Sequence, residues 1–122
     1  MITCLLWFVT SFLFLDPTHL KSQVMTIEIE NVQLAHSLGA KVHDSSGSPM
    51  AGVLVEELSP DWKVSLRSTK TDAAGAFTFV PVKGREIYYL QLTFKNFNAL
   101  RVRVKVNRKR GKDLQLQMEV ST

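Results

Sequence analysis

Two aspartates are the residues whose surroundings first suggest chemistry. Asp44 begins the run Asp-Ser-Ser-Gly and Asp72 begins Asp-Ala-Ala-Gly, so each aspartate precedes a glycine by three residues. Calcium takes about six to eight oxygen ligands, and each loop supplies a single carboxylate. An aspartate that opens a β-turn accepts hydrogen bonds from backbone N–H groups, and a glycine at the fourth position takes positive φ at no steric cost. We therefore interpret Asp44, Gly47, Asp72 and Gly75 as structural turn residues.

Other reactive side chains do not form a catalytic or metal-binding pattern in the sequence. The histidines show no metal-ligand spacing, and His43 alternates with apolar neighbours, so it is expected to face outward. Glu56 and Glu57 would point to opposite faces of a strand, and we interpret them as strand surface or a bulge. Cys4, the single cysteine, lies in an apolar N-terminal segment. The sequence predicts a protein that is not an enzyme and uses no metal or cofactor.

Basic residues are concentrated in one part of the chain. There are 15 Lys and Arg against 11 Asp and Glu, and residues 95–112 hold eight of these cations and no acid. A surface of one sign concentrates anions around it. A charged, solvated strand also resists edge-to-edge pairing, and this simpler interpretation stays open. The candidate anion- or partner-binding residues are Arg101, Arg103, Lys105, Arg108, Lys109, Arg110 and Lys112.

Trp62 is a further candidate contact residue, because it lies in the polar connection Ser-Pro-Asp-Trp-Lys at 59–63. An aromatic ring in a loop can stack on a sugar or a partner protein, or it can pack over the end of the domain. The partners that fit are an envelope protein, an anionic polysaccharide or a membrane surface. Nucleic acid is disfavoured, because Phe94 and Phe97 are the aromatic residues near the cations and both are expected in the core. A small-molecule substrate is not expected.

Alternation of apolar and polar residues predicts the strands that would position these side chains. The expected strands are residues 25–30, 38–43, 53–58, 64–71, 76–80, 88–94, 100–106 and 114–120. The last two are joined by the polar stretch 107–112, which predicts a β-hairpin. Seven or eight short strands separated by turn residues are typical of an all-β, antiparallel β-sandwich.

An apolar segment precedes these strands. Residues 4–15 read CLLWFVTSFLFL, and about twelve helical residues would span roughly 18 Å, less than the roughly 30 Å hydrocarbon core of a bilayer. The length favours a secretory signal peptide cleaved near Ser22, over an uncleaved membrane anchor or a mis-started reading frame. We expect residues 1–22 to be this leader and 23–122 to be one domain, which is secreted, periplasmic or attached to the cell envelope.

Three motifs in order resemble the carboxypeptidase regulatory-like domain family. They read LGAKVHDSSGSPMAGVLV from Leu38, TKTDAAGAFTF from Thr69 and YYLQLTFKNF from Tyr88. The resemblance implies a transthyretin-like, Greek-key β-sandwich, and a non-catalytic module that binds a protein partner or an anionic surface polymer. Two alternatives are a structural module of a larger envelope assembly and a transthyretin-related hydrolase. The hydrolases end in Tyr-Arg-Gly-Ser, whereas this chain ends Met-Glu-Val-Ser-Thr.

Overall fold

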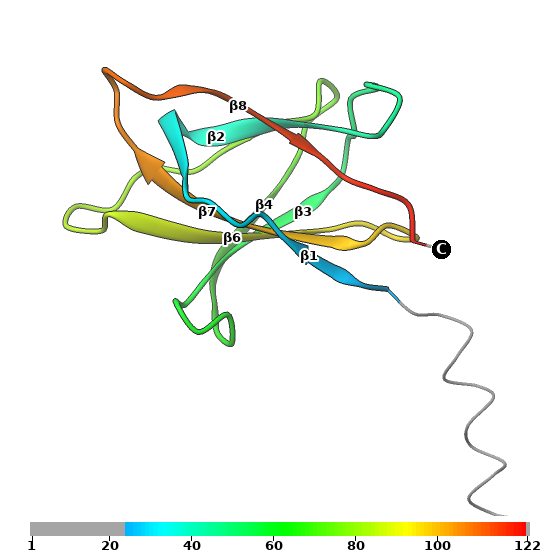
Figure 1. Cartoon of the computed structure of the whole chain (residues 1–122), viewed down its shortest axis with the longest axis horizontal. Helices are drawn as coiled ribbons and strands as arrows, with labels where there is room; N and C mark the ends of the chain where they lie inside the picture. The colour runs from blue at the N-terminus through cyan, green and yellow to red at the C-terminus, as the bar shows by residue number, and fades with distance from the viewer. Residues whose placement is uncertain (1–23, 122) are drawn as a thin grey trace, which may run out of the picture.

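The computed structural model describes residues 24–121, which form eight β-strands (Figure 1). The strands are β1 (Thr26–Glu28), β2 (Gln33–His43), β3 (Leu54–Leu58), β4 (Ser65–Lys70), β5 (Ala76–Thr78), β6 (Ile87–Thr93), β7 (Ala99–Val106) and β8 (Lys112–Gln117). The described residues contain no helix, and therefore none that could cross a membrane. The predicted all-β class is confirmed. The predicted leader, residues 1–22, lies outside the described part of the chain.

The strands form one mixed sheet that curls over on itself. Its order is β4-β3-β6-β7-β2-β5, with β1 paired to β7 and β8 paired to β2. The β1–β7, β2–β7 and β2–β8 pairs are parallel, so the prediction of a wholly antiparallel sheet is wrong. The strand β2 is shared, because its beginning pairs with β7 and its end pairs with β8 and β5. It joins what we call the large limb (β4, β3, β6, β7 and β1) to the small limb (β2, β5 and β8), and the two limbs face each other in Figure 1.

The chain crosses between the limbs after β7, and the predicted hairpin of β7 with β8 is therefore wrong. The strand β7 pairs antiparallel with β6, whereas β8 pairs parallel with β2. The crossing segment is fixed against β2, because the backbone N–H of Asn107 donates to the carbonyl oxygen of Ala35 at 2.8 Å. A Cβ atom placed on Gly111 would lie 2.1 Å from the Ala35 carbonyl carbon. The close approach of the two backbones therefore requires glycine at 111.

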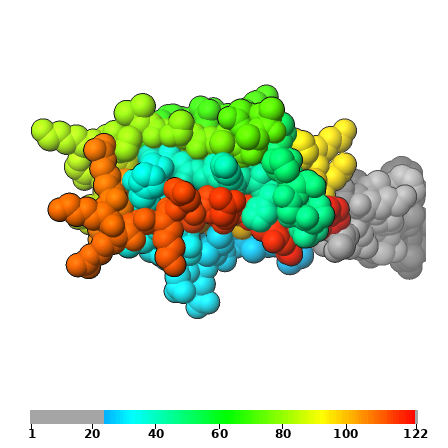
Figure 2. All heavy atoms as spheres, turned by 90° about the horizontal axis from the view of Figure 1, so that it is seen from above, coloured from blue at the N-terminus to red at the C-terminus, as the bar shows by residue number. Residues whose placement is uncertain are grey.

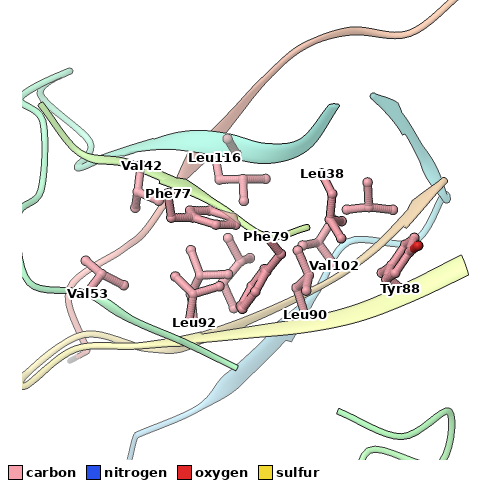
Figure 3. Packing of buried hydrophobic residues seen from close by; sticks show 14 of the residues in the cluster. Leu38, Val42, Val53, Phe77, Phe79, Tyr88, Leu90, Leu92, Val102 and Leu116 are labelled. Carbon is pink, nitrogen blue, oxygen red and sulfur yellow. The ribbon is translucent and has the colours of Figure 1, made fainter. Parts of the chain in front are cut away.

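The core lies between the two limbs (Figure 3). The large limb contributes alternate residues of β6 and β7, so Tyr88 and Leu90 are buried while Tyr89 and Gln91 are half-buried on the outer face. The small limb contributes residues from all three of its strands. The buried cluster from both limbs includes Leu38, Val42, Phe77, Leu90, Leu92, Val102, Val104 and Leu116. Because successive residues of a strand point to opposite faces, the alternation in the sequence marks which side of each strand is buried.

The two phenylalanines after β6 differ in their environment. Phe97 packs against the core, as expected, but Phe94 is 38% exposed, so its predicted place in the core is wrong. The strand β6 ends at Thr93. Beyond that residue the chain turns, and the alternation of a strand no longer determines which way a side chain points.

Candidate functional site

The loop that begins at Asp44 is a turn closed by the aspartate side chain. Asp44 Oδ1 accepts hydrogen bonds from the backbone N–H groups of Ser46 at 2.9 Å and Ser48 at 3.1 Å, and from the Ser46 hydroxyl at 2.6 Å. The Ser46 hydroxyl, followed by the Ser48 N–H, lowers the pKa of Asp44 below its ordinary value of 3.8. Gly47 takes a φ of 88°, which is the left-handed region that glycine enters without a steric penalty.

The loop that begins at Asp72 repeats this arrangement. Asp72 Oδ1 accepts hydrogen bonds from the N–H groups of Ala74 and Ala76, both at 2.9 Å, and Gly75 has a φ of 77°. The carbonyl oxygen of Gly75 accepts from the N–H of Val42 at 2.8 Å, which ties this turn to β2. In each loop one carboxylate oxygen holds the backbone, as the turn interpretation requires. The described residues contain no group of three or more His, Cys, Asp or Glu that could hold a metal ion.

Two of the candidate cations are already engaged by neighbouring groups. Arg101 donates from Nε to Gln91 Oε1 at 2.8 Å, and its guanidinium carbon lies 4.9 Å from the centroid of the Trp62 ring. Arg103 lies with Nε 4.0 Å from Glu28 Oε2, and it also donates to the carbonyl oxygen of Glu30. These arginines are held on the outer face of the large limb, Arg101 by an amide and an aromatic ring and Arg103 by a carboxylate and a carbonyl oxygen.

The remaining cations form a separate group, which we call the basic tip. They are Lys105, Arg108, Lys109, Arg110 and Lys112, and all five are exposed. None of them makes an ion pair with another residue in the range 24–121. Asp113, the adjacent acid, lies 3.5 Å from His36 Nε2 instead. In Figure 2 the segment between β7 and β8 projects from one end of the molecule.

The backbone of the basic tip is held in one turn. The Asn107 side-chain oxygen accepts from the N–H groups of Lys109 and Arg110, both at 3.0 Å. The N–H of Gly111 donates to the Asn107 carbonyl oxygen at 2.8 Å. Together with the contact of Asn107 and Gly111 with β2, these bonds fix where the cationic side chains emerge. The turn is therefore ordered before any ligand binds. Binding of a charged ligand to it costs less conformational entropy than binding to a loop that must first become ordered.

Trp62 lies on the outer face of the large limb. Its ring meets Tyr89 edge to face, with the centroids 5.2 Å apart and an interplanar angle of 84°, and Arg101 covers part of its face. Trp62 has a φ of 64°, which is unusual for a bulky side chain. A backbone in such a region costs about 1 to 3 kcal/mol and persists when the surroundings hold it.

The connection from β3 to β4 holds Trp62 in this conformation by hydrogen bonds. The Trp62 N–H donates to the carbonyl oxygen of Ser59 at 2.8 Å. Asp61 Oδ1 accepts from the Ser59 hydroxyl at 2.5 Å and from the Lys63 N–H at 3.1 Å, and these two donors, the hydroxyl first, lower the pKa of Asp61. The indole is thus a packed component of the outer face, next to Tyr89 and Arg101.

A buried ion cluster was missed by the sequence reasoning. Glu57 is 1% exposed, with Oε1 2.6 Å from Arg67 Nε and Oε2 2.5 Å from Arg85 Nη1. Its interpretation as strand surface is therefore wrong, although the pairing of β3 with β4 does shift register between Glu57 and Leu58. The signal that could have found it is the spacing of Glu57 from Val53 and Val55. Residues two and four apart on a strand share a face, and both valines are fully buried.

The ion cluster closes the gap between the two ends of the curled sheet. The strands β4 and β5 are the first and last in the sheet order. Arg67, from β4, donates from Nη1 to the carbonyl oxygen of Val80, two residues after β5, at 2.7 Å. Both carboxylate oxygens of Glu57 already hold arginines, so the cluster has a structural rather than a catalytic arrangement.

His43 is half-buried at the end of β2, next to the buried Val42. Its Nδ1 atom is buried and has no hydrogen-bond partner among residues 24–121. Its backbone is fixed by the segment just after β8, because the Met118 N–H donates to the His43 carbonyl oxygen at 2.9 Å.

These features define an all-β protein with an exposed cationic turn and a braced aromatic and polar outer face. A scan against family models finds no match to the sequence, and a search of curated proteins finds none. Among solved structures the chain is similar to 3-chlorocatechol 1,2-dioxygenase from Rhodococcus opacus 1CP, with a TM-score of 0.43 and 14% identity. The similarity covers 80% of this chain and 64% of the dioxygenase chain, so this chain spans less than two-thirds of that protein. A similarity of this size assigns neither a family nor an activity.

Proposed function

We propose that this protein is a non-catalytic, secreted or envelope-associated β-sandwich module that binds an anionic surface polymer through the basic tip. The observation that carries the proposal is the contrast between the two groups of cations. Arg101 and Arg103 are engaged by Gln91, Trp62 and Glu28, whereas the five cations of the tip have no ion-pair partner in the range 24–121. Charges of one sign that have no ion-pair partner raise the local concentration of anions, and the ordered turn presents them together.

We also propose that the curled sheet is a transthyretin-like, Greek-key sandwich of the carboxypeptidase regulatory-like kind. The support is local: both Asp-x-x-Gly runs of the motifs are turns in which the aspartate oxygen accepts backbone N–H bonds and the glycine has positive φ. The two limbs also enclose a single core between them. The N-terminal apolar run 4–15 supports export of the domain to the cell surface or beyond.

The test is binding to dextran sulfate, with uncharged dextran as the ligand control. The triple substitution Arg108→Ser, Lys109→Ser, Arg110→Ser removes three charges from the tip. At about 0.5 kcal/mol for each exposed pair, the loss of binding free energy is about 1.5 kcal/mol, or roughly tenfold in affinity. The affinity of the unchanged protein should also fall as salt is added, because salt screens exposed charges.

The matched control removes three exposed cations elsewhere. Lys41→Ser, Lys63→Ser and Lys83→Ser together change the net charge by the same amount without touching the tip. This control should bind dextran sulfate almost as well as the unchanged protein. Equal losses in the two triple variants would show that binding follows net charge alone, and would remove the tip as a site.

A further inference from the structure

Exposed apolar side chains gather where the described chain begins. Val24 is 55% exposed, Met25 62%, Phe94 38% and Val120 56%. With the half-buried Phe97 they form a group that we call the apolar end. Contacts bring its members together from three separate segments of the chain, because Val24 and Met25 precede β1, the phenylalanines follow β6, and Val120 follows β8.

The contacts at the apolar end are specific. The Phe94 and Phe97 rings lie 5.8 Å apart, edge to face, and Phe97 forms an isolated β-bridge with Val120. The Met25 N–H donates to the Asn98 side-chain oxygen at 3.0 Å, and the Met25 carbonyl accepts from the Ala99 N–H at 2.9 Å. An exposed and contiguous apolar surface of this kind marks a place of contact with another molecule or a membrane.

A hollow of about 570 Å³ opens at the apolar end. Its apolar lining includes Val24, Leu54, Phe94 and Phe97. Lys70 and Lys95 are the charged residues that line it, and no acid does. Glu119, although it precedes Val120, lines a different hollow beside β1. The surface therefore combines apolar side chains with two cations whose long stems can lie along them.

We propose that the apolar end is a membrane-contact face, which rests in the headgroup region of a bilayer that contains anionic phospholipid. Phe94, Val120 and their neighbours would enter the interface, and Lys70 and Lys95 would meet lipid phosphates. Lysines at such an interface are attracted to anionic lipids, and apolar side chains add buried area.

The position of the preceding chain favours a membrane over a protein partner. The described chain begins at Val24, which lines the hollow, and the sequence before it includes the almost wholly apolar run 4–15. That segment is therefore joined to the protein at this end, whether it is an export signal that delivers the domain across a membrane or an anchor that stays in one. The proposal is independent of polymer binding by the basic tip, which lies at the opposite end of the molecule (Figure 1).

The test uses the full chain with Cys4→Ser and one new cysteine, labelled with an environment-sensitive nitrobenzoxadiazole dye. The dye is placed at position 94 or 120 by Phe94→Cys or Val120→Cys. Val80→Cys is the matched control, because Val80 is 77% exposed and lies beside β5. Lys109→Cys reports on the basic tip. Circular dichroism checks that each labelled protein keeps its fold.

On addition of vesicles of phosphatidylcholine and phosphatidylserine, dye emission at 94 and 120 should shift to the blue and increase, while emission at 80 and 109 stays unchanged. The substitutions Lys70→Ser and Lys95→Ser should weaken binding to these vesicles, and Lys41→Ser with Lys63→Ser should not.

No vesicle binding, or binding with unchanged dyes at 94 and 120, overturns the proposal. A shift at 109 instead assigns lipid contact to the tip. Blue-shifted emission at 94 before vesicles are added means that another part of the chain covers the hollow, and this also overturns it.

Discussion

The guanidinium of Arg101 lies 4.9 Å from the centroid of the Trp62 ring, while its Nε donates to Gln91 at 2.8 Å. This contact links the middle of β7 to the connection between β3 and β4 across the outer face of the large limb. The guanidinium interacts with the face of the indole ring and with the side-chain oxygen of Gln91. The contact holds the indole ring against the outer face, while hydrogen bonds within residues 59–63 hold the Trp62 backbone at its positive φ.

Removal of Arg101 should loosen Trp62. In a Trp7→Phe background, where Trp62 is the only tryptophan, Arg101→Ala should increase quenching of its fluorescence by acrylamide, because one face of the ring becomes accessible. Loss of a cation–π contact at a partly exposed site should lower the free energy of unfolding by about 0.5 to 1 kcal/mol. Lys105→Ala, on the same face of the same strand, should leave the quenching unchanged. Equal quenching in all three proteins would mean that Arg101 does not shield the ring.

Neutralising Glu57 should destabilise the fold. Glu57→Gln leaves Arg67 and Arg85 without their shared carboxylate. The loss of one partner of a buried ion pair costs about 3 to 5 kcal/mol, and partial exposure of both arginines should reduce this to about 2 to 4 kcal/mol. Urea denaturation measures the change. Glu56→Gln, one residue earlier on the opposite face, is the matched control and should stay within about 0.5 kcal/mol. A Glu57 variant as stable as this control would show that the cluster does not stabilise the fold.

The stabilisation supplied by ionised Asp44 should depend on pH. Because hydrogen bonds from Ser46 and Ser48 lower its pKa in the folded protein, its stabilising effect is complete above the ordinary value of 3.8 and is lost as pH falls through the lower, folded value. The difference in unfolding free energy between the unchanged protein and Asp44→Asn should therefore be constant at neutral pH and shrink below 3.8. Denaturation curves at several pH values measure it. A difference that grows in acid would contradict the assignment.

A side chain at Gly111 should disturb the basic tip. Gly111→Ala places a Cβ 2.1 Å from the Ala35 carbonyl carbon, and relief of that overlap requires the crossing segment to move. Overpacking of this kind costs about 1 to 3 kcal/mol. Binding of dextran sulfate should weaken as well, since the turn that carries the cations is displaced.

Gly84→Ala is the control for this substitution. Gly84 has a φ of 86°, but a methyl group added there would meet no atom within 4 Å, so the cost is backbone strain alone, about 1 kcal/mol. It should leave polymer binding unchanged. If Gly111→Ala were the milder of the two, the close approach of the crossing segment to β2 would not be needed for stability.

The strands could be predicted because a strand with one buried face alternates apolar and polar residues within its own sequence. The alternation of Tyr88, Leu90 and Leu92 with half-buried residues is an example. The pairing of strands is not recorded locally. Leu114 lies opposite Ala40, far earlier in the chain, because the backbone of Asn107 is held by Ala35 and the crossing segment leads away from β7. The hairpin prediction paired β7 with β8 because a short polar loop joins them. That rule takes no account of the hydrogen bond between Asn107 and Ala35.

The candidate site was predictable in composition but not in detail. The cluster of cations is visible in the sequence, whereas the division between engaged and exposed members depends on Glu28, Gln91 and Trp62, which other segments supply. The burial of Glu57 follows from alternation, but its partners Arg67 and Arg85 lie on two other segments. Contacts made across the fold decide these roles, and no single window of sequence contains them.

The opposite placement of the basic tip and the apolar end has a mechanical consequence. The strands β1 and β2 both pair parallel with β7, the first near the apolar end and the second near the tip. If the tip is pulled away from the start of the chain, β7 is drawn along its own axis past these two neighbours. Force in that direction loads their hydrogen bonds in shear, so the bonds of each pair must break together instead of opening one after another. Tension along the line that joins the two ends is therefore resisted by groups of hydrogen bonds that act together.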